Sequence, residues 1–289
     1  MDRSTVLLCG MLIGCGRIGF DPAADDPAAD VPAVDIDPLV CGSWNAPVRV
    51  AELSSTEADY SPAISADGLS VMLQSERGGV EGLYEARRQS TADPFDPPEL
   101  NTKISSSSTD SHPTMSSDGL TLYFLSDRGG TFQIYVATRL TRSSEFADPQ
   151  LVASTAAFQL TGPSLSGDGT ELFVTIRNAS PDLGRVTDLD QPTATLELVS
   201  ELNTADTDGF PSASGDGLTL FWEGNGGSDI LTADRPDRSS PFGPSRIVEE
   251  LITNNYDGDP EISKDGRTIW FVSDRQGDPD IFMATRLCE

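Results

Sequence analysis

Apolar and polar positions are arranged in blocks that recur about every fifty residues along the chain. In each block, three consecutive large apolar residues begin four positions after the Asp of an Asp-Gly pair. A strand with one wet face alternates apolar and polar residues, so an unbroken apolar run predicts a strand covered on both faces. The five runs occupy residues 71–73, 122–124, 172–174, 220–222 and 269–271.

Each apolar run follows a turn phrase, Pro-x-x-Ser-x-Asp-Gly. Asp-Gly between β-prone runs predicts a tight hairpin turn, because Gly accepts positive φ and Asp bonds its own backbone. A unit of this length with one such turn and several strands is typical of a β-propeller. The five phrases begin at Pro62, Pro113, Pro163, Pro211 and Pro260.

The count of strands predicts how the ring closes. Each of the first four units is followed by a fourth strand, whereas the fifth ends at Leu287, and a matching segment at residues 44–50 precedes the first unit. We therefore predict an all-β fold, a five-bladed β-propeller of four-stranded antiparallel blades whose ring is closed by the N-terminal strand. The third unit departs from the pattern after Arg177, and we expect a longer or distorted excursion over residues 178–190.

Further shared phrases point to a family. Besides the Ser-x-Asp-Gly turn and the apolar run, Ser-Asp-Arg begins at Ser126 and Ser273, and Asp-Ile-Phe begins at Asp280. Together they resemble the WD-like propeller repeats of TolB-type proteins, over about residues 55–287. The resemblance implies the propeller architecture, which occurs in protein-binding propellers and in several enzymes, so it implies no single activity.

The N-terminus predicts export and a lipid anchor. Residues 6–14 form an apolar run behind Arg3 that suits a signal peptide and is too short to span a bilayer. The run ends in Leu-Ile-Gly-Cys at Cys15, which resembles the lipobox of bacterial lipoproteins and implies cleavage before Cys15 and lipidation of its thiol. An ordinary signal peptide cut nearby is the alternative. Gly16 after the cysteine favours sorting to the outer membrane of the bacterial cell envelope.

The chain then divides into three parts. Residues 1–14 are the predicted signal peptide, and residues 15–40 are the lipidated cysteine followed by an acidic tether rich in Pro and Ala, which we expect to be disordered. Residues 41–289 are the predicted propeller. Cys41 and Cys288 flank the closing strand and its antiparallel partner, so we expect a disulfide between them, with two unrelated buried thiols as the alternative. A disulfide implies an oxidising compartment.

The charge of the chain limits its partners. A formal net charge of −27 argues against nucleic acid and anionic lipid headgroups. We expect an envelope protein or a small polar ligand as partner, membrane contact only through the lipid anchor, and a monomer. This charge does not exclude cationic ligands.

Few residues are suited to catalysis. His112 is the only histidine, so a His-based metal cluster is excluded and a catalytic triad would need that residue. No Gly-x-Ser-x-Gly elbow is present. We expect no cofactor, no metal site and no catalytic residue.

One recurring group is a candidate for ligand binding. Aspartates lie three residues ahead of four of the five repeat prolines, and in the third unit Thr161 breaks the series. Propeller topology places these loops on one rim near the channel mouth, beside several aromatic residues. The candidate ligand rim comprises Asp59, Tyr60, Asp110, His112, Asp208, Phe210, Tyr256 and Asp257.

Two interpretations of this rim lead to two functions. The aspartates either bind a cationic or polyhydroxyl ligand, or cap turns and pair with Arg77, Arg128 or Arg275; their recurrence favours the second. We predict a non-enzymatic, envelope-anchored lipoprotein whose propeller is a binding platform. The alternative is a carbohydrate-active enzyme that uses channel carboxylates as acid and base.

Overall fold

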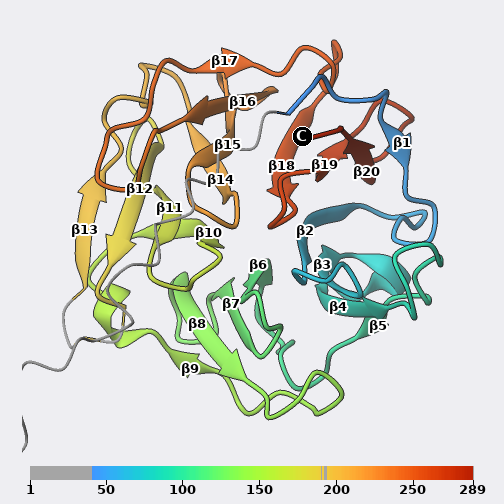
Figure 1. The fold of residues 1–289 in the computed structure, drawn as a ribbon. Coiled ribbons are helices and arrows are strands. Elements are labelled where there is room, and N and C mark those ends of the chain that lie inside the picture. The colour runs from blue at the N-terminus through green and yellow to red at the C-terminus, as the bar shows by residue number, and fades with distance from the viewer. Residues whose placement is uncertain (1–40, 190, 192–193, 289) are drawn as a thin grey trace, which may run out of the picture. The chain divides into compact units, whose positions relative to one another are not determined.

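The computed structural model describes residues 41–189, 191 and 194–288. In this part of the chain it contains five four-stranded antiparallel sheets arranged around a central axis (Figure 1). The predicted fold is confirmed. The predicted signal peptide, Cys15 and the tether lie outside the described residues. Within those residues, no helix is long and apolar enough to cross a membrane.

Each repeat forms one blade, with its innermost strand first in the sequence. The first three blades follow the chain without interruption. They are blade 1, with β2 (Asp59–Ile64), β3 (Ser70–Ser75), β4 (Gly82–Arg87) and β5 (Glu99–Leu100); blade 2, with β6 (Asp110–Met115), β7 (Thr121–Ser126), β8 (Gln133–Thr138) and β9 (Gln150–Leu151); and blade 3, with β10 (Leu160–Leu165), β11 (Leu172–Ile176), β12 (Asp182–Thr187) and β13 (Thr195–Leu198).

The last two blades differ in the origin of the outermost strand. Blade 4 takes all four strands from its own repeat, whereas blade 5 takes its outermost strand from the start of the described chain. They are blade 4, with β14 (Gly209–Ala213), β15 (Thr219–Gly224), β16 (Asp229–Asp234) and β17 (Arg246–Ile247); and blade 5, with β18 (Asp257–Ile262), β19 (Thr268–Ser273), β20 (Asp280–Thr285) and β1 (Val48–Arg49). Two short 3-10 turns, Arg77–Gly79 and Ala153–Thr155, complete the secondary structure.

The ring closes as predicted, because β1 pairs antiparallel with β20 and places Val48 opposite Met283. The Gly42 N–H donates to the Leu287 carbonyl over 2.8 Å, so the pairing extends well beyond the two residues of β1. Trp44 lies between blades 4 and 5, where its ring meets Phe221 edge-on. The closing segment therefore contributes both backbone bonds and core packing.

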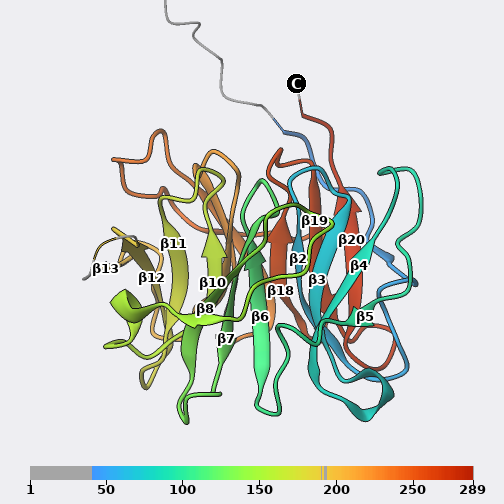
Figure 2. The same cartoon turned by 90° about the horizontal axis from the view of Figure 1, so that it is seen from below.

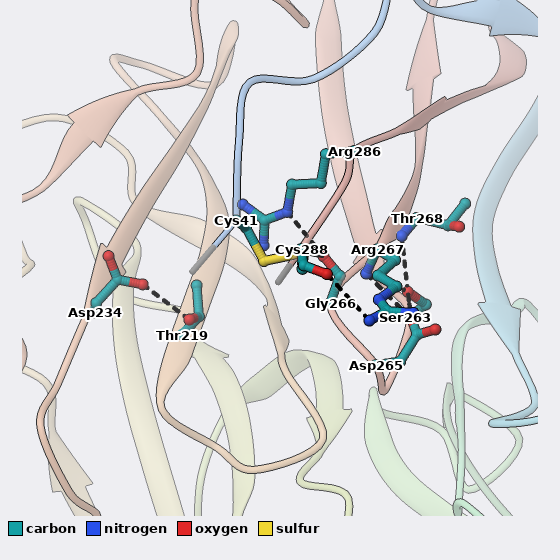
Figure 3. Close-up of a disulfide and its surroundings, with 10 residues drawn as sticks. All are labelled: Cys41, Thr219, Asp234, Ser263, Asp265, Gly266, Arg267, Thr268, Arg286 and Cys288. Carbon is teal, nitrogen blue, oxygen red and sulfur yellow. Dashed lines mark hydrogen bonds between the residues drawn. A yellow bond between two sulfur atoms is a disulfide. The ribbon is translucent and has the colours of Figure 1, made fainter. Parts of the chain in front are cut away.

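A disulfide joins Cys41 to Cys288 at this seam, as predicted (Figure 3). Arg267 donates to the Cys288 carbonyl over 3.2 Å, and Arg286 donates to the Gly266 carbonyl over 2.8 Å. The bridge thus lies beside the Asp-Gly turn of blade 5. Figure 2 shows both ends of the described chain leaving the same side of the propeller.

Five apolar clusters fill the spaces between neighbouring blades, one per interface. The apolar run of blade 1 shows how they form. Val71 and Leu73 pack toward blade 5, whereas Met72 between them packs toward blade 2. Both faces of the strand are covered, which explains the unbroken apolar runs.

The Asp-Gly turns lie at the opposite end of the innermost strands from the strands' first residues. In blade 1 the Ser65 hydroxyl donates to Asp67 over 2.7 Å, and Gly68 has a φ of 69° that favours glycine. We call this side the turn face and the opposite side the rim face.

Blade 3 is more regular than expected. β12 pairs with β11 without a break in register, so the expected distortion over residues 178–190 is wrong for residues 182–187. Its outermost strand, β13, is longer than those of the other blades. The unusual sequence of this repeat therefore changes the side chains on the blade rather than its architecture.

Candidate ligand site at the channel mouth

Four predicted rim residues form a buried set that we call the aspartate ring, Asp59, Asp110, Asp208 and Asp257. None of the four side chains is exposed to solvent. In each, one carboxylate oxygen accepts the backbone N–H of the residue four positions earlier, over 2.5 to 2.7 Å. These bonds hold the loop that leads into the innermost strand.

The second oxygen of each carboxylate accepts from a side chain of the same blade. In blade 5, the Arg275 guanidinium bridges Asp257, at 2.5 Å, to the carbonyl of Leu251. Blade 4 has no such arginine, and an indole N–H takes its place. The corresponding donors in blades 1, 2 and 4 are Arg77 at 2.7 Å, Arg128 at 2.6 Å and Trp222 at 3.1 Å.

The contacts of the aspartate ring are those of structural residues. A buried carboxylate with several donors is stable only while those donors stay in place. None of the four aspartates lines either cavity of the central channel described below. They stabilise the rim loops in this structure, and ligand contact through them remains a prediction.

A second set lies two positions further along each innermost strand, directly before the repeat proline. We call it the collar: Ser61, His112, Gly162, Phe210 and Asp259. At this position each innermost strand has a β-bulge, where two residues oppose one on the next strand. Bulges re-aim side chains. Here the bulges direct the collar residues toward the central channel, which narrows at this level to a cavity of about 30 Å³.

The collar has the same strained backbone in every blade. Its φ angles lie between 45° and 52°, in the left-handed region that non-glycine residues avoid. Four of the five residues carry side chains, and such strain costs on the order of 1–3 kcal/mol per residue and gathers at functional sites. The backbone is repeated, yet the five side chains differ in chemistry.

His112 and Phe210 come together across blade 3. Their rings stack with centroids 4.8 Å apart and 15° between planes. Gly162 lies between them, and a Cβ there would approach the Phe210 ring to 2.9 Å. Burial lowers the pKa of His112, outweighing the nearby Asp259, so the imidazole is neutral at pH 7. Its Nδ1 is buried and has no hydrogen-bond partner among the described residues.

Above this stack the channel opens toward the rim face into a cavity of about 380 Å³, which we call the rim pocket. His112 and Phe210 form its floor, since both also line the narrow channel. Leu125 and Phe132 contribute apolar walls, and Arg177 is the only charged residue of the described lining. The rim pocket thus contains aromatic surface and one cation, with no carboxylate from the described residues.

The other side of the channel is acidic and filled. Glu223 and Asp259 are at most 8% exposed, and the Tyr256 hydroxyl donates to Glu223 over 2.8 Å. Ser61 donates to Asp259 over 2.9 Å. Burial, with a smaller contribution from Asp259, raises the pKa of Glu223 to about 8, so this carboxyl group is protonated at pH 7.

A third acid, Glu261, lies beside them and accepts from Ser212 over 2.9 Å. Burial raises its pKa as well. No group of three or more His, Cys, Asp or Glu side chains in the described chain is arranged to hold a metal ion. These acids therefore act as neutral or hydrogen-bonded packing groups in this structure.

The structure places the predicted rim residues other than the aspartates in three different surroundings. His112 and Phe210 line the rim pocket, whereas Tyr256 belongs to the acidic side. Tyr60 is half-buried against the core between blades 5 and 1, and burial raises its pKa.

Sequence reasoning missed most of the collar and the acidic side. Three of the overlooked residues share one signal, because the position before the repeat proline varies while its neighbours recur: Ser61, Gly162 and Asp259. The other three, Arg177, Glu223 and Glu261, lie elsewhere in the repeat.

Comparisons with known proteins establish the fold and leave the family open. No protein-family model and no curated protein matches the chain. Among solved structures, a putative TolB from Agrobacterium tumefaciens is similar, at 19% identity, with a TM-score of 0.51 over 80% of this chain and 79% of that one.

Two further structures show how widely the fold is shared. TolB from Acinetobacter baumannii has 17% identity and a TM-score of 0.52, over 82% of this chain and 56% of that protein's. The catalytic domain of a GH62 α-L-arabinofuranosidase from Coprinopsis cinerea has 8% identity and a TM-score of 0.53, over 85% and 97%. At these identities the likeness concerns the propeller alone. The neighbours include TolB proteins and a glycosidase, so the activity must be argued from the site.

Proposed function

We propose that this protein is a non-enzymatic binding platform of the bacterial cell envelope, and that an envelope protein docks over the rim pocket. The lining of that pocket carries the proposal. It combines Phe132, Leu125 and the His112–Phe210 stack with one cation and no described carboxylate. Apolar concave surface with a few polar groups is typical of binding sites.

The glycosidase alternative has less support from the geometry. Such enzymes need two carboxyl groups about 5–10 Å apart on either side of the scissile bond. The channel acids are buried, and Asp259 and Glu261 line a space of about 30 Å³, too small for a sugar ring. The aspartate ring is engaged by arginines and an indole.

The proposed anchor suits this arrangement. Residue 41, where the anchoring segment joins the propeller, lies at the disulfide beside the Asp-Gly turn of blade 5, on the turn face. The rim pocket opens at the other end of the same strands. Attachment through Cys15 would thus join the propeller at its turn face and leave the rim face available to a partner.

Site-directed photo-crosslinking tests the platform directly. A benzophenone side chain at Thr207, in the rim pocket, should yield a discrete adduct with an envelope protein, whereas the same group at Arg267 on the turn face should not. Adducts of equal yield from both positions would contradict the proposal. Release of sugars from arabinan or other oligosaccharides by the purified protein would support the enzyme instead.

The anchor has its own test. Cys15→Ser should abolish incorporation of labelled fatty acid and release the protein from the membrane fraction. Labelling that persists in this variant would contradict the proposed lipobox.

A further inference from the structure

Blade 3 reverses a charge that other blades carry at the rim. Nine positions after the Asp of each Asp-Gly pair, blades 1, 2 and 5 have Glu76, Asp127 and Asp274. Blade 4 has Asn225, and blade 3 has Arg177. Asp127 and Asp274 each accept a backbone N–H of a rim loop, from Thr109 and Tyr256, which is a structural task that a guanidinium cannot perform.

The same blade also lacks the partners that would neutralise an arginine. Leu160 stands where the other blades have their aspartate, and Asn178 stands where blades 1, 2 and 5 have their paired arginine. Arg177 is exposed and has no carboxylate within 4 Å among the described residues. Its guanidinium carbon lies 5.4 Å from the centre of the Phe132 ring, which holds it over the rim pocket.

This cation is distinctive because the chain is so acidic. Asp and Glu number 46 against 19 Lys and Arg, yet no described carboxylate lines the rim pocket. A pocket with one unpaired cation selects an anion, and a carboxylate matches the planar fork of a guanidinium.

The floor of the pocket selects the rest of the ligand. The stacked imidazole and phenyl rings offer a flat apolar surface, and Leu125 and Phe132 extend it. The cavity of about 380 Å³ falls within the usual range for small-molecule sites, and the channel below is closed to anything larger than water. The site therefore suits a compact flat group that enters from the rim.

Building on the proposed function, we propose that the rim pocket binds a flat apolar group that carries a carboxylate. The carboxylate pairs with Arg177, and the flat body packs on the His112–Phe210 stack. Such a group is found in an aromatic residue beside an acidic residue of a partner protein, and in a free aromatic acid.

Matched probes test both features in the Cys15→Ser protein. Indole-3-acetate should bind at least about 10-fold more tightly than indole-3-acetamide, which keeps the ring and loses the charge. Acetate, which keeps the charge and loses the ring, should bind far more weakly than either. The acid's affinity should fall with added salt. Isothermal titration calorimetry measures all three.

Variants assign the preference to its residues. Arg177→Gln should remove the difference between acid and amide, whereas Phe210→Ala should weaken both probes to a similar degree. Arg246→Gln, which removes an exposed arginine from the outer strand of blade 4, is the control and should match the parent. Melting curves establish that each variant is folded.

The outcomes separate this inference from the proposed function. Equal binding of acid and amide, an acid preference that survives Arg177→Gln, or no binding of any probe would overturn the ligand class. The crosslink at Thr207 would still test the binding platform. A capped Trp-Glu peptide that binds more tightly than indole-3-acetate identifies a protein segment as the source; the reverse order identifies a free acid.

Discussion

The aspartate ring and the collar lie two residues apart in the same strands. They differ in which feature is repeated from blade to blade, the side chain or the backbone conformation. In four blades the same residue type, aspartate, accepts the same backbone hydrogen bond. Its second donor is an arginine in three of these blades and Trp222 in blade 4. The collar keeps one backbone conformation in all five blades and changes its side chain each time. The repeat thus conserves contacts where the loops need support and varies chemistry where the chain faces the channel.

The two halves of the channel extend this contrast. Toward blades 2, 3 and 4, the collar has His112, Gly162 and Phe210 and borders an open pocket. Toward blade 5 and blade 1, it has Asp259 and Ser61, whose side chains are bonded to each other over 2.9 Å. A single repeated backbone therefore supports one open, aromatic side and one filled, acidic side.

The largest expected effect comes from breaking the aspartate ring. Asp257→Ala removes the partner of Arg275 and of a buried backbone N–H, and breaking a buried pair typically costs about 3–5 kcal/mol. We expect a fall in the free energy of unfolding of this order, measured by urea titration. In the double variant with Arg275→Met the cost should be less than the sum of the single costs. A loss below about 1 kcal/mol would mean that repetition does not mark structural importance here.

The disulfide between Cys41 and Cys288 tests whether a feature that occurs only once in the described chain can also be structural. Replacing Cys41 and Cys288 together by Ser should cost about 2–5 kcal/mol, since the bridge spans a sequence separation of 247 residues. Thermal melting with and without reductant measures the loss. Identical melting of oxidised and reduced parent protein would contradict this expectation.

The buried acids of the channel should make the stability of the protein depend on pH. The folded protein holds a proton on Glu223 up to about pH 8, whereas the unfolded chain releases it near the ordinary value of 4.5. The folded state then binds more protons, so stability falls as pH rises from 4.5 to 8. Glu223→Gln should remove this decline and make the protein more stable than the parent at pH 8.

Melting temperatures at pH 5 and pH 8 provide this comparison. Glu99→Gln, at an exposed position of β5, is the control and should keep the parent's pH dependence. A Glu223→Gln protein that loses stability at pH 8 would show that the carboxyl group is charged and needed there.

The smallest expected effect on stability separates two glycines of blade 3. Gly162 and Gly169 both have positive φ, so an added Cβ costs each about 1 kcal/mol. At Gly169 the Cβ meets nothing within 4 Å, whereas at Gly162 it collides with Phe210. Gly162→Ala should therefore melt at a lower temperature than Gly169→Ala and weaken indole-3-acetate binding about 10-fold beyond it. Equal affinities would separate the His112–Phe210 stack from ligand binding.

Much of the fold is predictable because propeller repeats are local. The turn phrase, the apolar run and the missing fifth outer strand suffice for blade number, closure and the disulfide between Cys41 and Cys288. The pairing of Asp257 with Arg275 is also one of the two roles that the sequence suggests for this aspartate, since both residues recur at fixed offsets.

The site is harder to predict because it depends on which side chains a bulge turns inward. The bulge before each repeat proline brings His112 and Phe210 together from residues 98 positions apart, and only Gly162 leaves room for their contact. Arg177 was overlooked because the third repeat departs from the pattern there. That departure is where the structure places the rim pocket.

The central claim is that the collar binds a ligand while the aspartate ring holds the fold. His112 is the only histidine, so its imidazole gives a unique signal by NMR in the untagged Cys15→Ser protein. We predict that indole-3-acetate shifts this signal through the ring current of the stacked indole, in proportion to occupancy measured by calorimetry. An imidazole signal that stays fixed while the probe saturates the protein, or a probe that does not bind, would contradict the account.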